Sequence, residues 1–168
     1  ICGASSYPRN IDFCQFSKIA KCVDALLWAD IAHTVGLIAA GLVPSPLPHA
    51  DFVTSSTHKT WRGPRGGAII LCREEWAKKI DRAVFPGFQG APKMDLIAAR
   101  ATFFKEVMTK EFCAYAGQVI KNASALAAGL NDHGIRLVSG GTDTHLVLVD
   151  VQMQIASGAA AQDTLESI

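Results

Sequence analysis

The chain is organised around residues 52–67, FVTSSTHKTWRGPRGG. The stretch begins with small hydroxyl side chains, passes through His58 and Lys59, and ends in a turn of glycines, a proline and two arginines. Residues 68–72, AIILC, follow as a short apolar run that predicts a buried strand. The sequence therefore predicts a lysine that leaves a strand beside a turn whose backbone is stiffened by proline.

Lys59 is a candidate for covalent chemistry on a carbonyl compound. A lysine amine forms a Schiff base once it has lost its proton, and burial or a neighbouring cation favours that loss. Arg62 and Arg65 could supply the cation, and guanidinium groups also suit a phosphate or carboxylate ligand. The alternative is a solvated basic turn, because lysines in glycine- and proline-rich turns are common on protein surfaces.

Composition bounds the class of protein. The chain has 168 residues, of which 49% are hydrophobic and 18% charged, which predicts a globular protein with a core. Its net charge of +1 gives no reason to expect a nucleic acid or a membrane surface as a partner. The five cysteines include no C-x-x-C pair, so we expect a reduced, cytoplasmic protein without a metal site.

A second polar pair follows another apolar run, ALLW at residues 25–28, which predicts a buried strand. Open α/β sheets bind ligands at the carboxyl ends of their strands, so Asp30 is a candidate binding group. His33 could converge with Asp30 if the turn after the strand is tight, and a buried histidine without a chemical role is the alternative. The apolar run 26–43 has about the length of a membrane span, but its charged and glycine residues argue against one.

The rest of the chain predicts an α/β fold followed by a smaller α+β unit. Residues 1–7 look like a strand end that opens into a loop, with Ser5 at its carboxyl end. Apolar spacing predicts helices over 11–23, 73–84, 94–107 and 110–133, and residues 156–168 begin another. Two β-branched runs on either side of SGGTDT, residues 139–144, predict a pair of strands. We expect residues 1–110 and 111–168 to belong to different domains.

The segment FPGFQGAPK, residues 85–93, predicts a loop rich in glycine and proline. Such a loop can present backbone N–H groups to an anion. An ordinary connection between two helices explains the composition equally well.

Taken together, the order and spacing of these motifs resemble serine hydroxymethyltransferase, also called glycine hydroxymethyltransferase. The resemblance covers essentially the whole chain. Three stretches carry it: VTSSTHKTWRGPRGGAII at 53–70, DIAHTVGLIAAGLVPSPLPHA at 30–50 and SGGTDTHLVLVDV at 139–151. It implies a fold-type I pyridoxal-phosphate enzyme with the large aspartate-aminotransferase-like domain, a mainly parallel sheet and the start of a smaller C-terminal domain.

The resemblance implies roles for individual residues. Lys59 matches the lysine that holds pyridoxal 5'-phosphate as an internal aldimine. Asp30 matches the carboxylate that keeps the pyridine nitrogen protonated, so that the ring can act as an electron sink. His33 and Ser5 match residues near the cofactor's phenolic oxygen and the substrate carboxylate.

Further matches surround the lysine. Ser56 stands where the family more often has threonine and keeps the hydroxyl. His58 matches a residue linked to substrate choice and phosphate contact, and Arg65 matches the arginine of the G-P-R turn. Arg62 falls at a position that varies in the family, so no role is expected for it.

The loop at 89–92, QGAP, departs from the family's usual Q-G-G-P, which offers N–H groups to the phosphate held in the partner subunit. Alanine at position 91 keeps the N–H but disfavours a positive φ, so the phosphate contact is expected at Gly90. Asp95 replaces a histidine that is common in the family.

The activity implied is reversible transfer of serine's hydroxymethyl carbon to tetrahydrofolate, giving glycine and methylenetetrahydrofolate. A homodimer or tetramer with shared active sites is implied as well. The chain has no visible signal peptide and no initiator methionine, and further site residues of the family would precede Ile1 or follow Ile168. We therefore expect residues 1–168 alone to be inactive and to be part of a longer chain.

Three alternatives stay open. A folate-independent aldolase or transaldolase of the same fold could use these residues on another β-hydroxy amino acid. A relative without activity could serve as a binding subunit, although it would have no chemical need for Lys59, Asp30 and His33. A simple α/β binding module would leave Lys59 as an ordinary surface residue.

Overall fold

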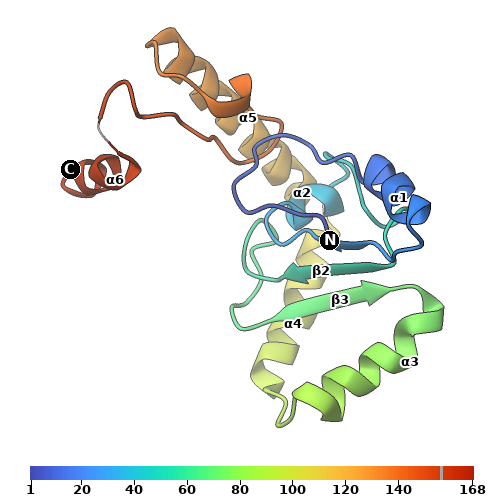
Figure 1. The fold of residues 1–168 in the computed structure, drawn as a ribbon. Coiled ribbons are helices and arrows are strands. Elements are labelled where there is room, and N and C mark those ends of the chain that lie inside the picture. The colour runs from blue at the N-terminus through green and yellow to red at the C-terminus, as the bar shows by residue number, and fades with distance from the viewer. Residues whose placement is uncertain (156) are drawn as a thin grey trace. The chain divides into compact units, whose positions relative to one another are not determined.

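Figure 1 shows the computed structural model of the chain, which describes residues 1–155 and 157–168. The described residues divide into two units. The first comprises Ile1–Ser5 and Ile11–Gly117, and the second comprises Ser6–Asn10 and Gln118–Ile168. Helices accompany a three-stranded sheet, so the α/β class expected from the sequence is confirmed. A domain boundary near Lys110 stays a prediction.

The sheet of the first unit has the strand order β1-β2-β3. Figure 1 labels β2 and β3, which lie side by side. Its strands are β1 (Trp28–Asp30), β2 (Phe52–Ser56) and β3 (Ala68–Cys72). β1 pairs with β2 in parallel, and β2 pairs with β3 antiparallel. Cys2 adds a parallel bridge to Ala29, so the chain start lies beside β1 as expected for a strand end. Parallel pairing therefore surrounds the strand that ends at Asp30.

The hydroxyl-rich strand β2 has two different faces. Burial alternates along it, with Val53 and Ser55 buried and Thr54 and Ser56 partly exposed. This is the period of two that a strand imposes on its side chains. Asp30 is the register partner of Thr54, so the two side chains share the partly exposed face.

The helices of the first unit follow the predicted spacing closely. They are α1 (Phe13–Cys22), α2 (Val35–Ala39), α3 (Glu74–Arg82) and α4 (Met94–Val107). The amide of Gln15 donates a 2.9 Å hydrogen bond to the Asp12 side chain, which caps the start of α1. The predicted helices over 11–23, 73–84 and 94–107 are confirmed to within two residues at each end.

The loop predicted over residues 85–93 is partly replaced by a wide helical turn. The π-helical segment η1 (Ala83–Phe88) continues from α3, and Gln89 N donates to Val84 O at 2.7 Å. Phe85 has extended backbone angles within this turn. Residues 89–93 lie between η1 and the next helix and belong to no helix or strand, so the predicted loop is kept there.

The long helix α5 (Lys110–Asp132) ends where the sequence predicts. Gly134 follows it with a φ of 72°, a conformation that glycine adopts without strain. No helix in the described part of the chain combines the length and the apolar character needed to cross a bilayer.

The predicted pair of strands around residues 139–144 was wrong in extent. Only an isolated antiparallel bridge forms, between Leu137 and Val149. Ser139, Gly140 and Gly141 have φ values of 66°, 69° and 150°, which turn the backbone out of the extended conformation. The short 3-10 helix η2 (Val138–Gly140) occupies the place of the first strand's end.

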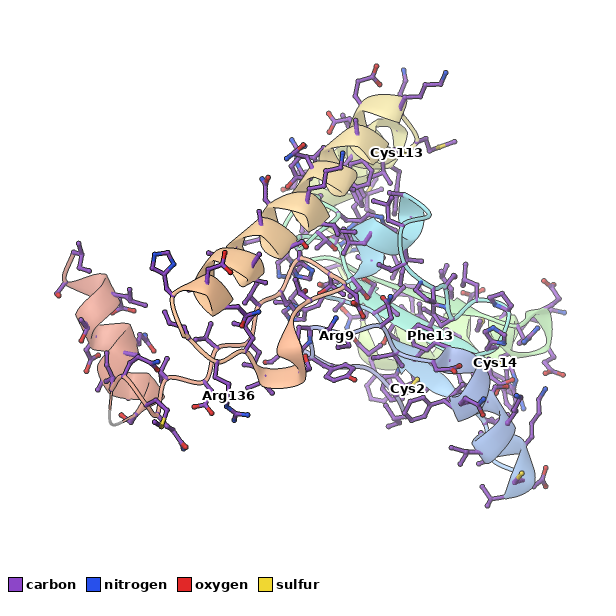
Figure 2. All side chains as sticks on the ribbon, turned by 90° about the horizontal axis from the view of Figure 1, so that it is seen from above. Cys2, Arg9, Phe13, Cys14, Cys113 and Arg136 are labelled. Carbon is purple, nitrogen blue, oxygen red and sulfur yellow. The ribbon has the colours of Figure 1, made fainter. Side chains whose placement is uncertain are left out.

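Side-chain contacts hold the second unit together. Arg9 pairs with Asp143, and Arg136 pairs with Asp150 (both arginines are labelled in Figure 2). The last helix, α6 (Gly158–Glu166), is capped by Ser157, whose Oγ accepts a 3.2 Å hydrogen bond from Ala160 N. The predicted helical segment began at residue 156, which lies outside the described residues.

An aromatic cluster packs α4 against the turn that follows Lys59. The ring centroids of Trp61 lie 5.8 Å from Phe103 and 5.5 Å from Phe104. A β-carbon on Gly63 would lie 2.9 Å from the Phe103 ring, so glycine is needed for this close approach. The turn predicted to be rigid is thus held by packing as well as by its proline.

Candidate functional site

Asp30 ends β1 with its carboxylate held at both oxygens. Oδ1 accepts a 3.0 Å hydrogen bond from Ala32 N, and Oδ2 accepts a 2.7 Å hydrogen bond from Thr54 Oγ1. Each carboxylate oxygen has two lone pairs, so one acceptor position on each oxygen is left. The side chain is exposed in the chain as described and is therefore open to a ligand.

The turn after β1 brings His33 into electrostatic contact with two charged residues. Thr34 N donates to Ile31 O at 3.0 Å, which makes the turn tight. Burial lowers the pKa of His33 below its ordinary value of 6.5, Lys59 lowers it further, and Asp30 acts in the opposite direction. Asp30 and Lys59 therefore both act on the charge of His33, and Thr60, next to Lys59, bonds to the backbone of His33. The shared role of the three side chains of Asp30, His33 and Lys59 stays a prediction.

The Lys59 loop is closed by the buried hydroxyl of Thr57. Thr57 Oγ1 donates to Pro64 O at 2.6 Å and lies 3.2 Å from Gly67 O. The carbonyl of Thr57 accepts a 2.8 Å hydrogen bond from Gly63 N. Residues 57–67 thus form a closed loop that presents Lys59, which is half-buried.

Thr60 ties this loop to α2 and to the His33 turn. Its hydroxyl donates to His33 O at 2.9 Å and accepts from Gly36 N at 2.9 Å. A β-carbon on Gly36 would overlap the carbonyl oxygen of Thr60. The backbone positions of His33 and Lys59 are therefore linked through one side chain.

Two buried polar atoms next to Lys59 lack a hydrogen-bond partner among the described residues. They are Ser56 Oγ and His58 Nδ1. Buried polar atoms are nearly always hydrogen-bonded in folded proteins, so unpaired ones need an explanation. Ser56 and His58 lie on either side of Thr57 just before Lys59, so hydrogen-bonding capacity without a described partner lies beside the lysine.

The two arginines of the turn have different surroundings. The guanidinium of Arg62 lies 4.5 Å from the centre of the Tyr115 ring, a cation–π contact with the first part of α5. Arg62 also has a φ of 63°, which is unusual for a residue with a side chain. Arg65 is exposed and remains available for an anion. Arg62 thus has a packing role, although the sequence suggested it as a cation for Lys59.

Ser5 and Gly90 lie on exposed segments. The segment before Ser5 passes directly against Asp30, because a β-carbon on Gly3 would lie 3.2 Å from Asp30 Cβ. Gly90 has open space around its α-carbon, and Ala91 next to it adopts a φ of 43°. None of the described hydrogen bonds joins Gly90 to Asp30 or Lys59. The roles given to Ser5 and Gly90 stay predictions.

Three threonines that position the site had no role in the sequence analysis. Thr54 bonds Asp30, Thr57 closes the lysine loop, and Thr60 joins His33 to Gly36. A period-two reading of residues 52–57 separates Thr54 and Ser56 from Ser55 and Thr57, and that signal was present in the sequence. Nothing in the sequence alone indicated the partners of Thr57 and Thr60, which depend on the turn geometry.

Within the described residues, no group of three or more histidine, cysteine, aspartate and glutamate side chains could hold a metal ion. Comparison with models of protein families gives a match over residues 1–168, which includes Asp30, His33 and Lys59, and the matching model is that of serine hydroxymethyltransferase.

Proposed function

The chain belongs to the serine hydroxymethyltransferase family, and from that premise we propose that the full-length protein interconverts serine and glycine with tetrahydrofolate as the one-carbon acceptor. The reaction turns serine and tetrahydrofolate into glycine and 5,10-methylenetetrahydrofolate, and it is reversible. Family membership supports a pyridoxal-phosphate-dependent transferase of amino-acid and one-carbon metabolism. The single observation that carries the proposal is the hydrogen-bonded turn in which Thr60 bonds to His33 O beside Lys59, with Asp30 at the end of the neighbouring strand.

The residues around Lys59 fit pyridoxal phosphate. Lys59 would hold its carbonyl carbon covalently, and the free acceptor positions on Asp30 would take the ring N–H. Ser56 Oγ and His58 Nδ1 are buried without a partner among the described residues, and a polar cofactor would supply one. When bound, pyridoxal phosphate supplies an electron-withdrawing ring that stabilises negative charge at the substrate's Cα.

Side chains of the protein would provide the proton-transfer and ligand-binding groups. Because burial and Lys59 lower the pKa of His33 below its ordinary value of 6.5, the neutral form of its ring predominates at pH 7, and a neutral imidazole carries one N–H and one acceptor nitrogen. Lys59 would hold the cofactor, and its Nζ would take up or give a proton. Arg65 is exposed and would bind a carboxylate or phosphate, and Ser5 would add a hydroxyl near Asp30.

A shared active site is part of the proposal. The exposed loop at Gly90 would offer its backbone N–H to the phosphate of a cofactor held in a second subunit, so we propose a homodimer or tetramer. The five cysteines are free thiols, which supports the cytoplasm as the compartment.

The assignment of Lys59 is tested by visible absorbance of the full-length protein with added pyridoxal phosphate. The wild type should show a band that borohydride reduction fixes to the protein, and Lys59→Ala should not. Lys18→Ala, which removes an exposed lysine from α1, is the matched control and should keep the band. An unchanged band in Lys59→Ala would reject the assignment.

A folate-independent aldolase or transaldolase is the second candidate. The departures of Ala91 and Asp95 from the family's usual glycine and histidine leave room for it, although Ala91 keeps a left-handed conformation that glycine also adopts. Activity on serine that requires tetrahydrofolate supports the first candidate. Cleavage of other β-hydroxy amino acids at the same rate with and without tetrahydrofolate supports the second.

A further inference from the structure

A chain of hydrogen bonds crosses the exposed face of β1 and β2 and ends on Asp30. Trp28 Nε1 donates to Thr54 Oγ1 at 2.8 Å, and Thr54 Oγ1 donates to Asp30 Oδ2 at 2.7 Å. Trp28 and Asp30 are two residues apart on β1, so both side chains lie on the same face as Thr54, the register partner of Asp30. Neither Trp28 nor Thr54 has a place in the mechanism given above.

The direction of these hydrogen bonds is fixed by chemistry. An indole N–H can only donate, and an ionised carboxylate can only accept. The Thr54 hydroxyl has one proton, which must therefore point to Asp30 while its oxygen accepts from Trp28. Each bond in such a chain polarises the next, so the indole strengthens the contact between the hydroxyl and the carboxylate.

We propose that Thr54 and Trp28 are positioning residues that hold the Asp30 carboxylate in one orientation for the cofactor's ring nitrogen. The inference rests on the proposed function, because it assumes that Asp30 is the partner of that nitrogen. Ala32 N holds Oδ1 and Thr54 holds Oδ2, so the carboxylate plane is fixed by two donors. An exposed aspartate without these donors would populate several rotamers and would lose part of that preorganisation.

If Thr54 only stabilises the sheet, its substitution should have a different effect. A cross-strand hydrogen bond that only stabilises the sheet would change the melting temperature and leave the bound cofactor as it is. A bond that orients Asp30 would change the affinity for pyridoxal phosphate and the absorbance of the bound cofactor. Conservative variants separate the two, because serine keeps the hydroxyl and valine keeps the shape.

The experiment compares Thr54→Val, Thr54→Ser and Trp28→Phe in the full-length protein. We expect Thr54→Val to raise the dissociation constant for pyridoxal phosphate by about tenfold. This is the effect expected when one hydrogen bond to a charged group is lost. Thr54→Ser should stay within about threefold of the wild type, and Trp28→Phe should fall between them. The pH dependence of the cofactor's visible band should move in Thr54→Val and be kept in Thr54→Ser.

The cofactor-free protein gives an independent measurement. In a protein labelled with ¹⁵N-tryptophan, the indole signal of Trp28, assigned by its loss in Trp28→Phe, should shift in both Thr54→Val and Asp30→Asn. It should stay near its wild-type position in Thr54→Ser. These shifts report the chain of hydrogen bonds whether or not the protein is loaded.

The outcomes distinguish the inference from the proposed function. If the wild type binds pyridoxal phosphate and Thr54→Val binds it equally well with an unchanged band, the inference is overturned and the proposed function stands. The inference is also overturned if the indole signal of Trp28 shifts in neither Thr54→Val nor Asp30→Asn. If the wild type does not bind pyridoxal phosphate, the proposed function fails and the inference fails with it.

Discussion

Both a cation, Lys59, and an anion, Asp30, act on the charge of the His33 ring. Burial and Lys59 lower the pKa of His33, and Asp30 raises it. These opposed effects give a measurement of the three residues that needs no substrate. They also decide how the stability of the folded chain depends on pH.

We predict that Lys59→Met raises the pKa of His33 and that Asp30→Asn lowers it, in the cofactor-free protein. Removing Lys59 takes away a positive charge that disfavours the imidazolium, and removing the Asp30 charge takes away a stabilising one. NMR titration of the His33 ring protons measures both changes. Shifts of the same sign in the two variants would contradict these opposed effects of Lys59 and Asp30.

The sign of the effect on stability follows from linkage. Because the pKa of His33 is lower in the folded protein than the ordinary value of 6.5, the unfolded chain binds more protons near that pH. This group's effect is absent well above pH 6.5, and the free energy of unfolding falls as the pH drops through 6.5 toward the folded pKa. His33→Asn should flatten that part of a urea-denaturation profile against pH.

The sequence predicts chemical residues for the site, but it does not predict the residues that position them. Asp30, His33 and Lys59 stand in motifs whose order resembles one family, and the family match confirms that resemblance. Thr57 and Thr60 bond to backbone atoms that only the folded turn brings near, such as Pro64 O and His33 O. The identity of a threonine in the sequence does not reveal the hydrogen-bond partner of its hydroxyl. The sequence therefore assigns no role to Thr57 or Thr60.

At the level of elements, α2 and the lysine loop are packed so closely that glycine is required between them. A β-carbon on Gly36 would overlap Thr60 O and approach Trp61 N to 2.9 Å. Both atoms belong to backbone, which cannot rotate away as a side chain can. The position of α2 therefore requires a residue without a β-carbon at position 36.

We predict that Gly36→Ala destabilises the protein by about 1–3 kcal/mol, the usual cost of overpacking. It should also weaken pyridoxal-phosphate binding, because Thr60 links the same contact to His33 O. Urea denaturation of the full-length protein measures the first effect.

Gly129→Ala is the matched control for this prediction. Gly129 lies inside α5 with no atom near its missing β-carbon, so alanine there should stabilise by about 1 kcal/mol. Equal effects of the two substitutions would mean that the contact between Gly36 and Thr60 is looser than described.

Helices were predicted to within a few residues, whereas the second pair of strands was not. Helical spacing is a local pattern, and α1, α3, α4 and α5 satisfy it with their own hydrogen bonds. A strand needs a partner in register, and the positive φ values from Ser139 to Gly141 interrupt the pairing after a single bridge. The sequence predicts a turn at SGGTDT. It does not predict that this turn prevents the residues on either side from pairing as strands.

At the scale of the whole molecule, the chain passes from one unit to the other more than once. Ser6–Asn10 belong to the second unit, although Ser5 and Ile11 on either side belong to the first. Pro8 O accepts a 2.9 Å hydrogen bond from Asp143 N, and Arg9 Nη1 donates to Asp143 Oδ1 at 2.7 Å. Arg9 and Asp143 are 134 residues apart in the sequence. No local sequence pattern could predict a contact over that separation.

We predict that Arg9→Ala loosens the loop at residues 139–144 and changes the acid side of the stability profile. The hydrogen bond from Arg9 lowers the pKa of Asp143 below its ordinary value of 3.8. The stability that this pair contributes is therefore present above pH 3.8 and is lost as the pH falls through the lower pKa of the folded state. Hydrogen exchange of the 139–144 amides measures the loosening, and urea denaturation against pH measures the slope.

Arg82→Ala is the matched control, because it removes an exposed arginine from the end of α3 in the other unit. It should leave the exchange of residues 139–144 as in the wild type. Faster exchange in both variants would assign the effect to the loss of net charge rather than to the contact with Asp143.

The contact between Arg9 and Asp143 has a consequence for the order in which the protein is made. The ribosome releases Pro8 and Arg9 among the first residues of the printed sequence, and 134 more residues must be translated before Asp143 emerges. At ordinary elongation rates of about 5–20 residues per second, the N-terminal segment waits roughly 7–30 seconds for its partner. During that interval the segment lacks its partner, and this contact of the second unit can form only after the chain up to Asp143 has left the exit tunnel.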